Sequence, residues 1–195
     1  MYSFALAVFF LLITPGPGVL SVAGVGSGFG RRAGMRYMGG LFIGTNLVAL
    51  AVISGAAAFV FSYPYLRDGL LFASGAYLLY LALKIAFSGS KIAFIESETA
   101  PGIRGGILLQ MINPKSYAVN TALFTGFGFW PDDLESEIAV KLVIANMIWV
   151  PIHVLWLTAG ISLRRLNLGK GTQRFINAAM AVSMLAVVAL AALAN

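Results

Sequence analysis

One lysine lies in the middle of a long apolar stretch that contains no other charged residue. Lys115 belongs to the motif I-N-P-K-S (112–116), within residues 105–130. At the rise of an α-helix it lies about 15 Å into this stretch, close to the midplane of a bilayer that the stretch would cross. A charge at that depth is costly unless it meets a partner or water. Lys115 is therefore predicted to line an internal polar site.

The apolar runs also indicate what Lys115 binds. They contain no Asp or Glu, so the natural partner is an anionic group from outside the protein. We expect this group to be on a small substrate, for example a carboxylate. The alternative is a lysine that is held by backbone carbonyls or that has lost its proton.

Two proline motifs interrupt apolar runs, and they predict where that site lies. The first, T-P-G-P-G (14–18), contributes four candidate substrate-binding residues, namely Pro15, Gly16, Pro17 and Gly18. The second is Pro114, directly before Lys115. Proline removes a backbone donor from a helix and clashes with the preceding turn, and the freed groups must be buried or face water inside a membrane. Paired breaks in corresponding spans predict a substrate site, with packing kinks as the alternative.

Other polar residues in the apolar runs extend the list of candidates. Asn113 can cap the helix broken at Pro114 or touch a ligand, and helix N-termini attract anions. His153 is the one histidine of the chain. It is a candidate proton relay and equally a candidate hydrogen-bond partner for a neighbouring helix. Hydrogen bonds between helices are the alternative for the amides in the spans, namely Asn46, Gln110, Asn113, Asn120 and Asn146.

The composition is that of a membrane protein. Of the 195 residues 59% are hydrophobic and 10% are charged, whereas soluble domains carry about 25% charged residues. The mean hydropathy is +0.89. We expect a single transmembrane domain over residues 1–195. The first apolar run is expected to stay as a span, because it lacks the basic start of a signal peptide.

Six apolar runs are close to or above the ~20 residues that cross a bilayer as a helix. They are residues 1–30, 37–61, 69–87, 105–130, 142–163 and 175–195. The predicted fold is an all-α polytopic membrane protein with six transmembrane helices, of which the first and fourth are broken. Three spans on either side of a polar loop (89–102) give halves of opposite orientation, 1–88 and 103–195, as in an inverted repeat.

The basic residues gather on one side of this predicted topology. Ten of the thirteen lie in or beside the connections after the first, third and fifth runs. The positive-inside rule makes that side cytoplasmic and both termini periplasmic. Arginines so placed set topology and contact lipid headgroups, which argues against nucleic acid as a partner.

The sequence lacks the residues that a catalytic site would need. With one histidine, no cysteine and no acid within the apolar runs, neither a metal site nor a nucleophile–base pair can be assembled. No metal and no cofactor are expected.

Several motifs, in this order, resemble the LysE/RhtB family of amino-acid exporters. They are I-T-P-G-P-G (13–18) with G-R-R-A-G (30–34), G-A-Y-L-L-Y-L-A-L-K (75–84), and R-G-G-I-L-L-Q-M-I-N-P-K-S (104–116). The resemblance covers most of the chain. It implies a bacterial inner-membrane exporter of amino acids or related small metabolites, driven by exchange with a proton or another cation.

The chain departs from the family pattern at two places. Gly18 stands where P-G-P is usually followed by Asn, and Gly44 is followed by Thr45 and Asn46 where the family carries an acidic residue. No carboxylate is then left to bind a substrate ammonium or to take a proton. Asn113 and Lys115 match the family pattern.

The sequence thus predicts a secondary-active exporter whose substrate site combines both breaks with Thr45, Asn46, Asn113 and Lys115. Its expected partners are a small carboxylate-bearing substrate, the lipid bilayer and a coupling ion, and a homodimer is left open. A passive anion-selective channel or oligomeric pore, with Lys115 in the conduction path, is the first alternative. A structural membrane subunit is the second.

Overall fold

The computed structural model describes residues 1–86, 100–165 and six separate positions beyond them, 171, 172, 175, 178, 179 and 182. The predicted loop at 89–102 lies mostly outside the described residues, and so does the predicted sixth span at 175–195. In the described part every regular element is a helix. The helices are α1 (Tyr2–Ile13), α2 (Pro17–Phe29), α3 (Arg31–Ile53), α4 (Ala56–Phe61), α5 (Pro64–Ala86), α6 (Ile103–Ile112), α7 (Pro114–Gly126) and α8 (Leu134–Arg165).

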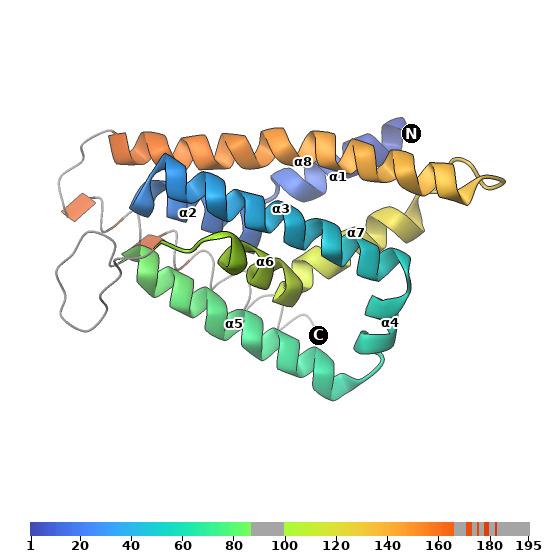
Figure 1. Ribbon diagram of the computed structural model, residues 1–195, viewed down its shortest axis with the longest axis horizontal. Helices are drawn as coiled ribbons and strands as arrows, with labels where there is room; N and C mark the ends of the chain where they lie inside the picture. Colours follow the sequence, from blue (N-terminus) through green and yellow to red (C-terminus); the bar gives the residue numbers. More distant parts are fainter. Residues whose placement is uncertain (87–99, 166–170, 173–174, 176–177, 180–181, 183–195) are drawn as a thin grey trace.

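The long helix α8 forms one side of the bundle (Figure 1). Both α1 and α2 pack against it, and α3 lies beside α2 and α8. On its other side α3 packs against α6, which in turn contacts α5. The short helix α4 turns the chain from α3 into α5.

Two of these helices are long and apolar enough to cross a membrane, Arg31–Ile53 and Leu134–Leu163. Helices α1 and α2 pass the same test together, although they meet at an angle of 50°. The structure therefore confirms an all-helical membrane protein with two or three candidate spans among the described residues. The six spans and the inverted halves go beyond these findings.

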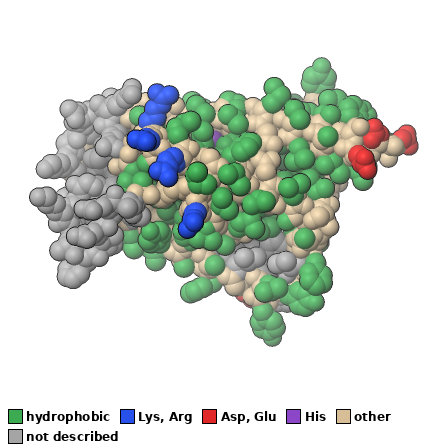
Figure 2. Space-filling model, viewed as in Figure 1, with side chains coloured by type: hydrophobic (Ala, Val, Ile, Leu, Met, Phe, Trp, Pro, Cys, Tyr) green, Lys and Arg blue, Asp and Glu red, His purple; other side chains and the backbone are tan. Residues whose placement is uncertain are grey.

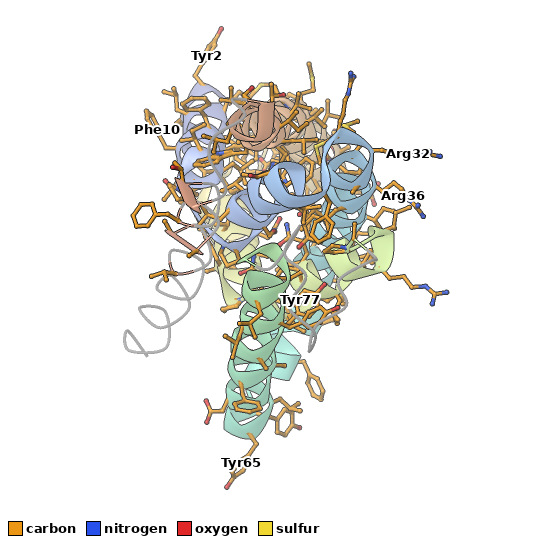
Figure 3. The ribbon with its side chains drawn as sticks, turned by 90° about the vertical axis from the view of Figure 1, so that its left-hand side faces the viewer. Tyr2, Phe10, Arg32, Arg36, Tyr65 and Tyr77 are labelled. Atoms are coloured by element: carbon orange, nitrogen blue, oxygen red, sulfur yellow. The ribbon has the colours of Figure 1, made fainter. Side chains whose placement is uncertain are left out.

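Charged side chains separate toward two ends of the bundle (Figure 2). The basic end comprises Arg31, Arg32, Arg36 and Arg104. The acidic end comprises Asp132, Asp133 and Glu135, at the connection between α7 and α8. Seen from the basic end, Arg32 and Arg36 point away from the bundle, while Tyr77 lies on its inner side (Figure 3). The Tyr77 hydroxyl donates to the carbonyl of Gly105 at 2.9 Å and so ties α5 to α6.

Glycines allow two pairs of helices to touch backbone to backbone. A Cβ at Gly40 of α3 would collide with the carbonyl of Ile103 on α6, and one at Gly106 would collide with the backbone of α3. A Cβ at Gly160 of α8 would likewise collide with the carbonyl of Ala23 on α2. Small residues at such contacts let membrane helices pack closely. The bundle therefore contains two tightly packed pairs, α3 with α6 and α2 with α8.

Helix α8 begins at Leu134, eight residues before the predicted run at 142, and this brings an ion pair into the bundle. Glu137 and Lys141 lie one turn apart, with Oε1 and Nζ separated by 2.7 Å, and both side chains are buried. The other carboxylate oxygen of Glu137 accepts hydrogen bonds from the backbone N–H groups of Phe129 and Trp130. The Lys141 ammonium also faces the ring of Phe4 on α1. The pair thus fixes the α7–α8 connection and the start of α1 to α8.

We expect Lys141→Met to lower the thermal unfolding temperature of the purified protein by several degrees, because it leaves a buried carboxylate without its cation. The double variant Glu137→Gln/Lys141→Met should recover most of the loss, since a neutral amide still accepts the two backbone hydrogen bonds. Equal unfolding temperatures for the single and double variants would contradict this account.

Candidate functional site

A small cavity lies between the two breaks in the bundle. Its volume is about 50 Å³, and side chains from α1, α2, α3, α6, α7 and α8 line it. The polar lining residues are Thr14, Thr45, Gln110, Asn113, Lys115, Ser116, Asn120 and His153. Leu11, Leu12, Val19, Val119 and Trp149 supply an apolar wall. The cavity therefore combines one cation with neutral polar groups and an apolar surface, and no carboxylate is among the described residues that line it.

The first break separates α1 from α2 and frees two carbonyl groups. Helix α1 ends at Ile13, Gly16 adopts an extended conformation, and α2 begins at Pro17. The carbonyls of Thr14 and Pro15 fall in the gap between the two helices. Proline at the first helical position cannot donate a backbone hydrogen bond, which is why the helix restarts there.

The second break separates α6 from α7 at Asn113. The Asn113 side chain accepts a hydrogen bond from the backbone N–H of Lys115 at 3.1 Å and so caps α7, which starts at Pro114. Its Nδ2 donates to Oε1 of Gln110 at 3.1 Å. Gln110 in turn donates to the hydroxyl of Thr45 on α3 at 2.6 Å. The predicted capping role of Asn113 is present, and it is linked to α3 through Gln110.

Lys115 joins the two breaks. Its ammonium donates to the carbonyl of Thr14 at 2.8 Å and to that of Pro15 at 3.4 Å. Its side chain runs over Gly16, where a Cβ would lie 2.8 Å from Cδ and 2.9 Å from Nζ of the lysine. In this conformation the lysine is therefore held by backbone carbonyls, the alternative that the sequence left open. Binding of a substrate carboxylate by Lys115 stays a proposal.

His153 lies against the opposite wall of the cavity. Its ring stacks on Trp149 with 3.5 Å between the ring centroids, and its Nδ1 lies 2.9 Å from the Trp149 carbonyl. Its Nε2 faces Gly18, where a Cβ would lie 3.7 Å away. One ring nitrogen is thus fixed by the backbone while the other faces the cavity.

The structure brings most of the predicted site residues together and separates one. Gly16, Gly18, Thr45, Asn113, Lys115 and His153 line the cavity. Pro15, Pro17 and Pro114 shape the breaks without lining it. Asn46 is absent from this cavity and lines an adjoining one.

Sequence reasoning missed four polar residues of the cavity lining as site residues, together with its apolar wall. The four are Thr14, Gln110, Ser116 and Asn120. The spacing of Gln110, Asn113, Ser116 and Asn120, at intervals of three, three and four, places them on one helical face. That period, read across the Asn-Pro break, was the signal that could have found Gln110, Ser116 and Asn120.

An all-helical membrane bundle with two broken helices meeting at a partly buried cation has the architecture of a small-molecule translocator. The family model for LysE type translocators matches residues 9–195, and the chain belongs to this family. Family membership places the protein among translocators and not among enzymes.

Individual relatives share about a quarter of their aligned residues with this chain. The chain is 26% identical over 131 residues to a leucine efflux protein of Enterobacter sp. (strain 638), and 25% identical over 131 residues to one of Salmonella typhimurium. It is 27% identical over 135 residues to an uncharacterized membrane protein of Pseudomonas aeruginosa. Each match covers 65% of this chain and 62% of the relative, so the chain spans less than two thirds of the relatives' length. No solved structure matches the chain.

The contact between Lys115 and Gly16 yields a matched pair of variants. Gly16→Ala should displace the lysine from the Thr14 and Pro15 carbonyls and lower the thermal unfolding temperature. Gly18→Ala should be tolerated, since its nearest neighbours would lie at 3.5 and 3.7 Å.

In a Lys115→Ala background, Gly16→Ala should no longer lower the thermal unfolding temperature, because the side chain with which it clashes is gone. An undiminished cost in that background would show that Gly16 matters for another reason.

Proposed function

We propose that the protein is a secondary-active exporter of amino acids with uncharged, apolar side chains, or of closely related metabolites, across the bacterial inner membrane. The observation that carries this proposal is the Lys115 ammonium at the meeting point of two broken helices, in a cavity lined without a carboxylate. Membership of a translocator family and relatives named leucine efflux protein support it.

The cavity offers a place for each part of such a substrate. A carboxylate would replace the Thr14 and Pro15 carbonyls as the partner of Lys115, a stronger hydrogen bond because both groups are charged. The substrate ammonium would be met by neutral oxygens, such as those of Thr45 and Asn120. An aliphatic side chain would pack against the apolar wall around Trp149. A second positive charge on the substrate would find no carboxylate among the lining residues, which disfavours dibasic amino acids.

The described conformation is closed to such a substrate. A buried water molecule needs a cavity volume of about 10–15 Å³, so a cavity of about 50 Å³ holds a few waters. Pockets that hold small organic ligands are several times larger, about 300 Å³ or more. The transport cycle therefore includes states in which the helices around Lys115 separate.

The rest of the proposal concerns topology and energy coupling. Six spans in two inverted halves would alternate access to the site, with the basic end in the cytoplasm and both termini in the periplasm. The second ring nitrogen of His153, Nε2, lies toward Gly18 of the cavity lining and would serve as a proton relay in exchange with the substrate. A coupling proton or other cation and a homodimer belong to the same proposal.

The first test is efflux of labelled leucine from preloaded cells, comparing the wild type with Lys115→Met at matched expression. We expect the wild type to export leucine and the variant to lose at least about nine tenths of the rate, the effect of removing one charge-assisted contact. Lysine export should be absent from both. Wild-type cells that export none of a panel of neutral amino acids would refute the substrate class.

The helix break at Pro114 gives a second test. Pro114→Ala lets α6 and α7 approach one continuous helix, so we expect leucine efflux to fall several-fold while the unfolding temperature changes little. Unchanged efflux would reduce the break to a packing kink.

The same assay separates a transporter from a passive pore with Lys115 in its path. A transporter saturates with internal leucine and is accelerated by external leucine through exchange. A pore conducts in proportion to the gradient and shows neither effect.

A further inference from the structure

A second cavity, of about 30 Å³, adjoins the one at Lys115. The two share five lining residues, namely Leu12, Thr45, Val119, Asn120 and Trp149. The lining that belongs only to the second cavity includes Leu123 and Phe124 on α7 and Leu142 and Asn146 on α8. These residues lie one to two turns closer to the acidic end. We call this space the outer cavity, because it extends the Lys115 cavity toward that end.

A pair of amides closes the side of the outer cavity between α3 and α8. Asn46 and Asn146 exchange two hydrogen bonds, each from Nδ2 of one residue to Oδ1 of the other, at 3.0 and 2.9 Å. Each Nδ2 also donates to a carbonyl one turn earlier in its own helix, Phe42 at 2.9 Å and Leu142 at 3.0 Å. All the N–H groups of the two amides are thus engaged, half of them across the helix interface.

This amide pair connects two closely packed bodies, which also touch each other where α3 packs against α2 and α8. Helix α3 is closely packed with α6 through Gly40 and Gly106, and α8 with α2 through Gly160. The contact between Asn46 and Asn146 bridges these two pairs where α3 and α8, which lie close together near the basic end, diverge toward the acidic end (Figure 1). Separating the two bodies there requires that the two interhelical hydrogen bonds break.

We propose that the outer cavity is the route by which the substrate passes from Lys115 toward the acidic end, and that the Asn46–Asn146 amide pair is the latch that closes it. The identity of the substrate rests on the function proposed above, whereas the latch is a property of the bundle itself.

The residues around the latch explain why it opens when water or substrate enters the outer cavity. Leu123, Phe124 and Leu142 border the outer cavity, so separated amides would face these apolar groups and lose hydrogen bonds that such groups cannot replace. Water or a polar substrate that enters from the Lys115 cavity supplies replacement partners. Hydrogen bonds between membrane helices are also individually weak, so two of them can reopen within a transport cycle. The latch therefore stays closed while the outer cavity is dry, and it opens when water or a polar substrate enters.

A static fastener would use the same two hydrogen bonds, and accessibility separates the two roles. The chain has no cysteine, so Ser116→Cys places a single thiol in the Lys115 cavity with little change of volume. Its rate of reaction with a membrane-impermeant thiol reagent is measured in sealed vesicles of both orientations. A separate variant, Ser136→Cys, carries an exposed thiol at the acidic end and identifies the vesicles in which that end is accessible.

In those vesicles we expect Asn46→Ala/Asn146→Ala to raise the labelling rate of Ser116→Cys about tenfold, the shift that two membrane hydrogen bonds supply. Tyr77→Phe is the matched control. It removes a hydrogen bond between α5 and α6 at 2.9 Å, away from both cavities, and should leave the rate unchanged. An unchanged rate in the double alanine variant, or an equal rise in the control, would overturn the latch.

A second variant covers the case in which the double alanine protein does not fold. Asn46→Cys/Asn146→Cys, joined by a short bifunctional thiol reagent that is cleaved by reduction, should stop leucine efflux when bridged and restore it when reduced. Efflux that continues through the bridged protein would overturn the route.

The two assays distinguish the failure of each proposal. A wild type that exports no leucine, together with faster labelling after loss of the amides, refutes the substrate and keeps the latch. Normal leucine efflux with unchanged labelling keeps the exporter and refutes the latch.

Discussion

The bond between the Lys115 ammonium and the carbonyls of Thr14 and Pro15 is the interaction around which the described bundle is organised. The lysine gives the two carbonyls a hydrogen-bond donor, and the carbonyls give the lysine charge a polar partner. The break after α1 leaves two carbonyls without helical partners, and the start of α7 places a charge deep in an apolar chain. Either group alone would be costly inside a membrane. Together they join the first and second breaks and allow both to exist.

The polar network that continues from this bond is neutral. Asn113, Gln110 and Thr45 connect α7, α6 and α3 through hydrogen bonds of 2.6, 3.1 and 3.1 Å, and no carboxylate takes part in them. A neutral network does not hold a substrate ammonium as tightly as an acidic group would, and it needs no counter-charge when the cavity empties. Beside Gly44, where the family resemblance implies an acid, the chain carries a hydroxyl that lines both cavities and an amide that lines only the outer one.

The prolines and the lone lysine could be understood from the sequence, because a break and a charge in an apolar run have few physical explanations. The break at Pro15–Pro17, the cap by Asn113 and the inward place of Lys115 follow from local chemistry. The partner of Lys115 could not be found in this way, because backbone carbonyls leave no mark in a sequence.

The buried pair Glu137–Lys141 was missed for a related reason. Its residues precede the apolar run predicted at 142–163, and only the packing of α8 against α1 shows that they face inward. Likewise, Asn46 and Asn146 are 100 positions apart, and only the tertiary structure shows that they are partners.

The close contact of Gly160 with Ala23 has a consequence for how the protein is made. Eleven of the thirteen residues of α2 are buried, and much of that burial is against α8, the last long helix described. During synthesis the ribosome delivers α2 early and α8 late, because domains emerge from the N-terminus onward. The side of α2 that contacts α8 therefore lacks this protein partner until the later helix has been inserted.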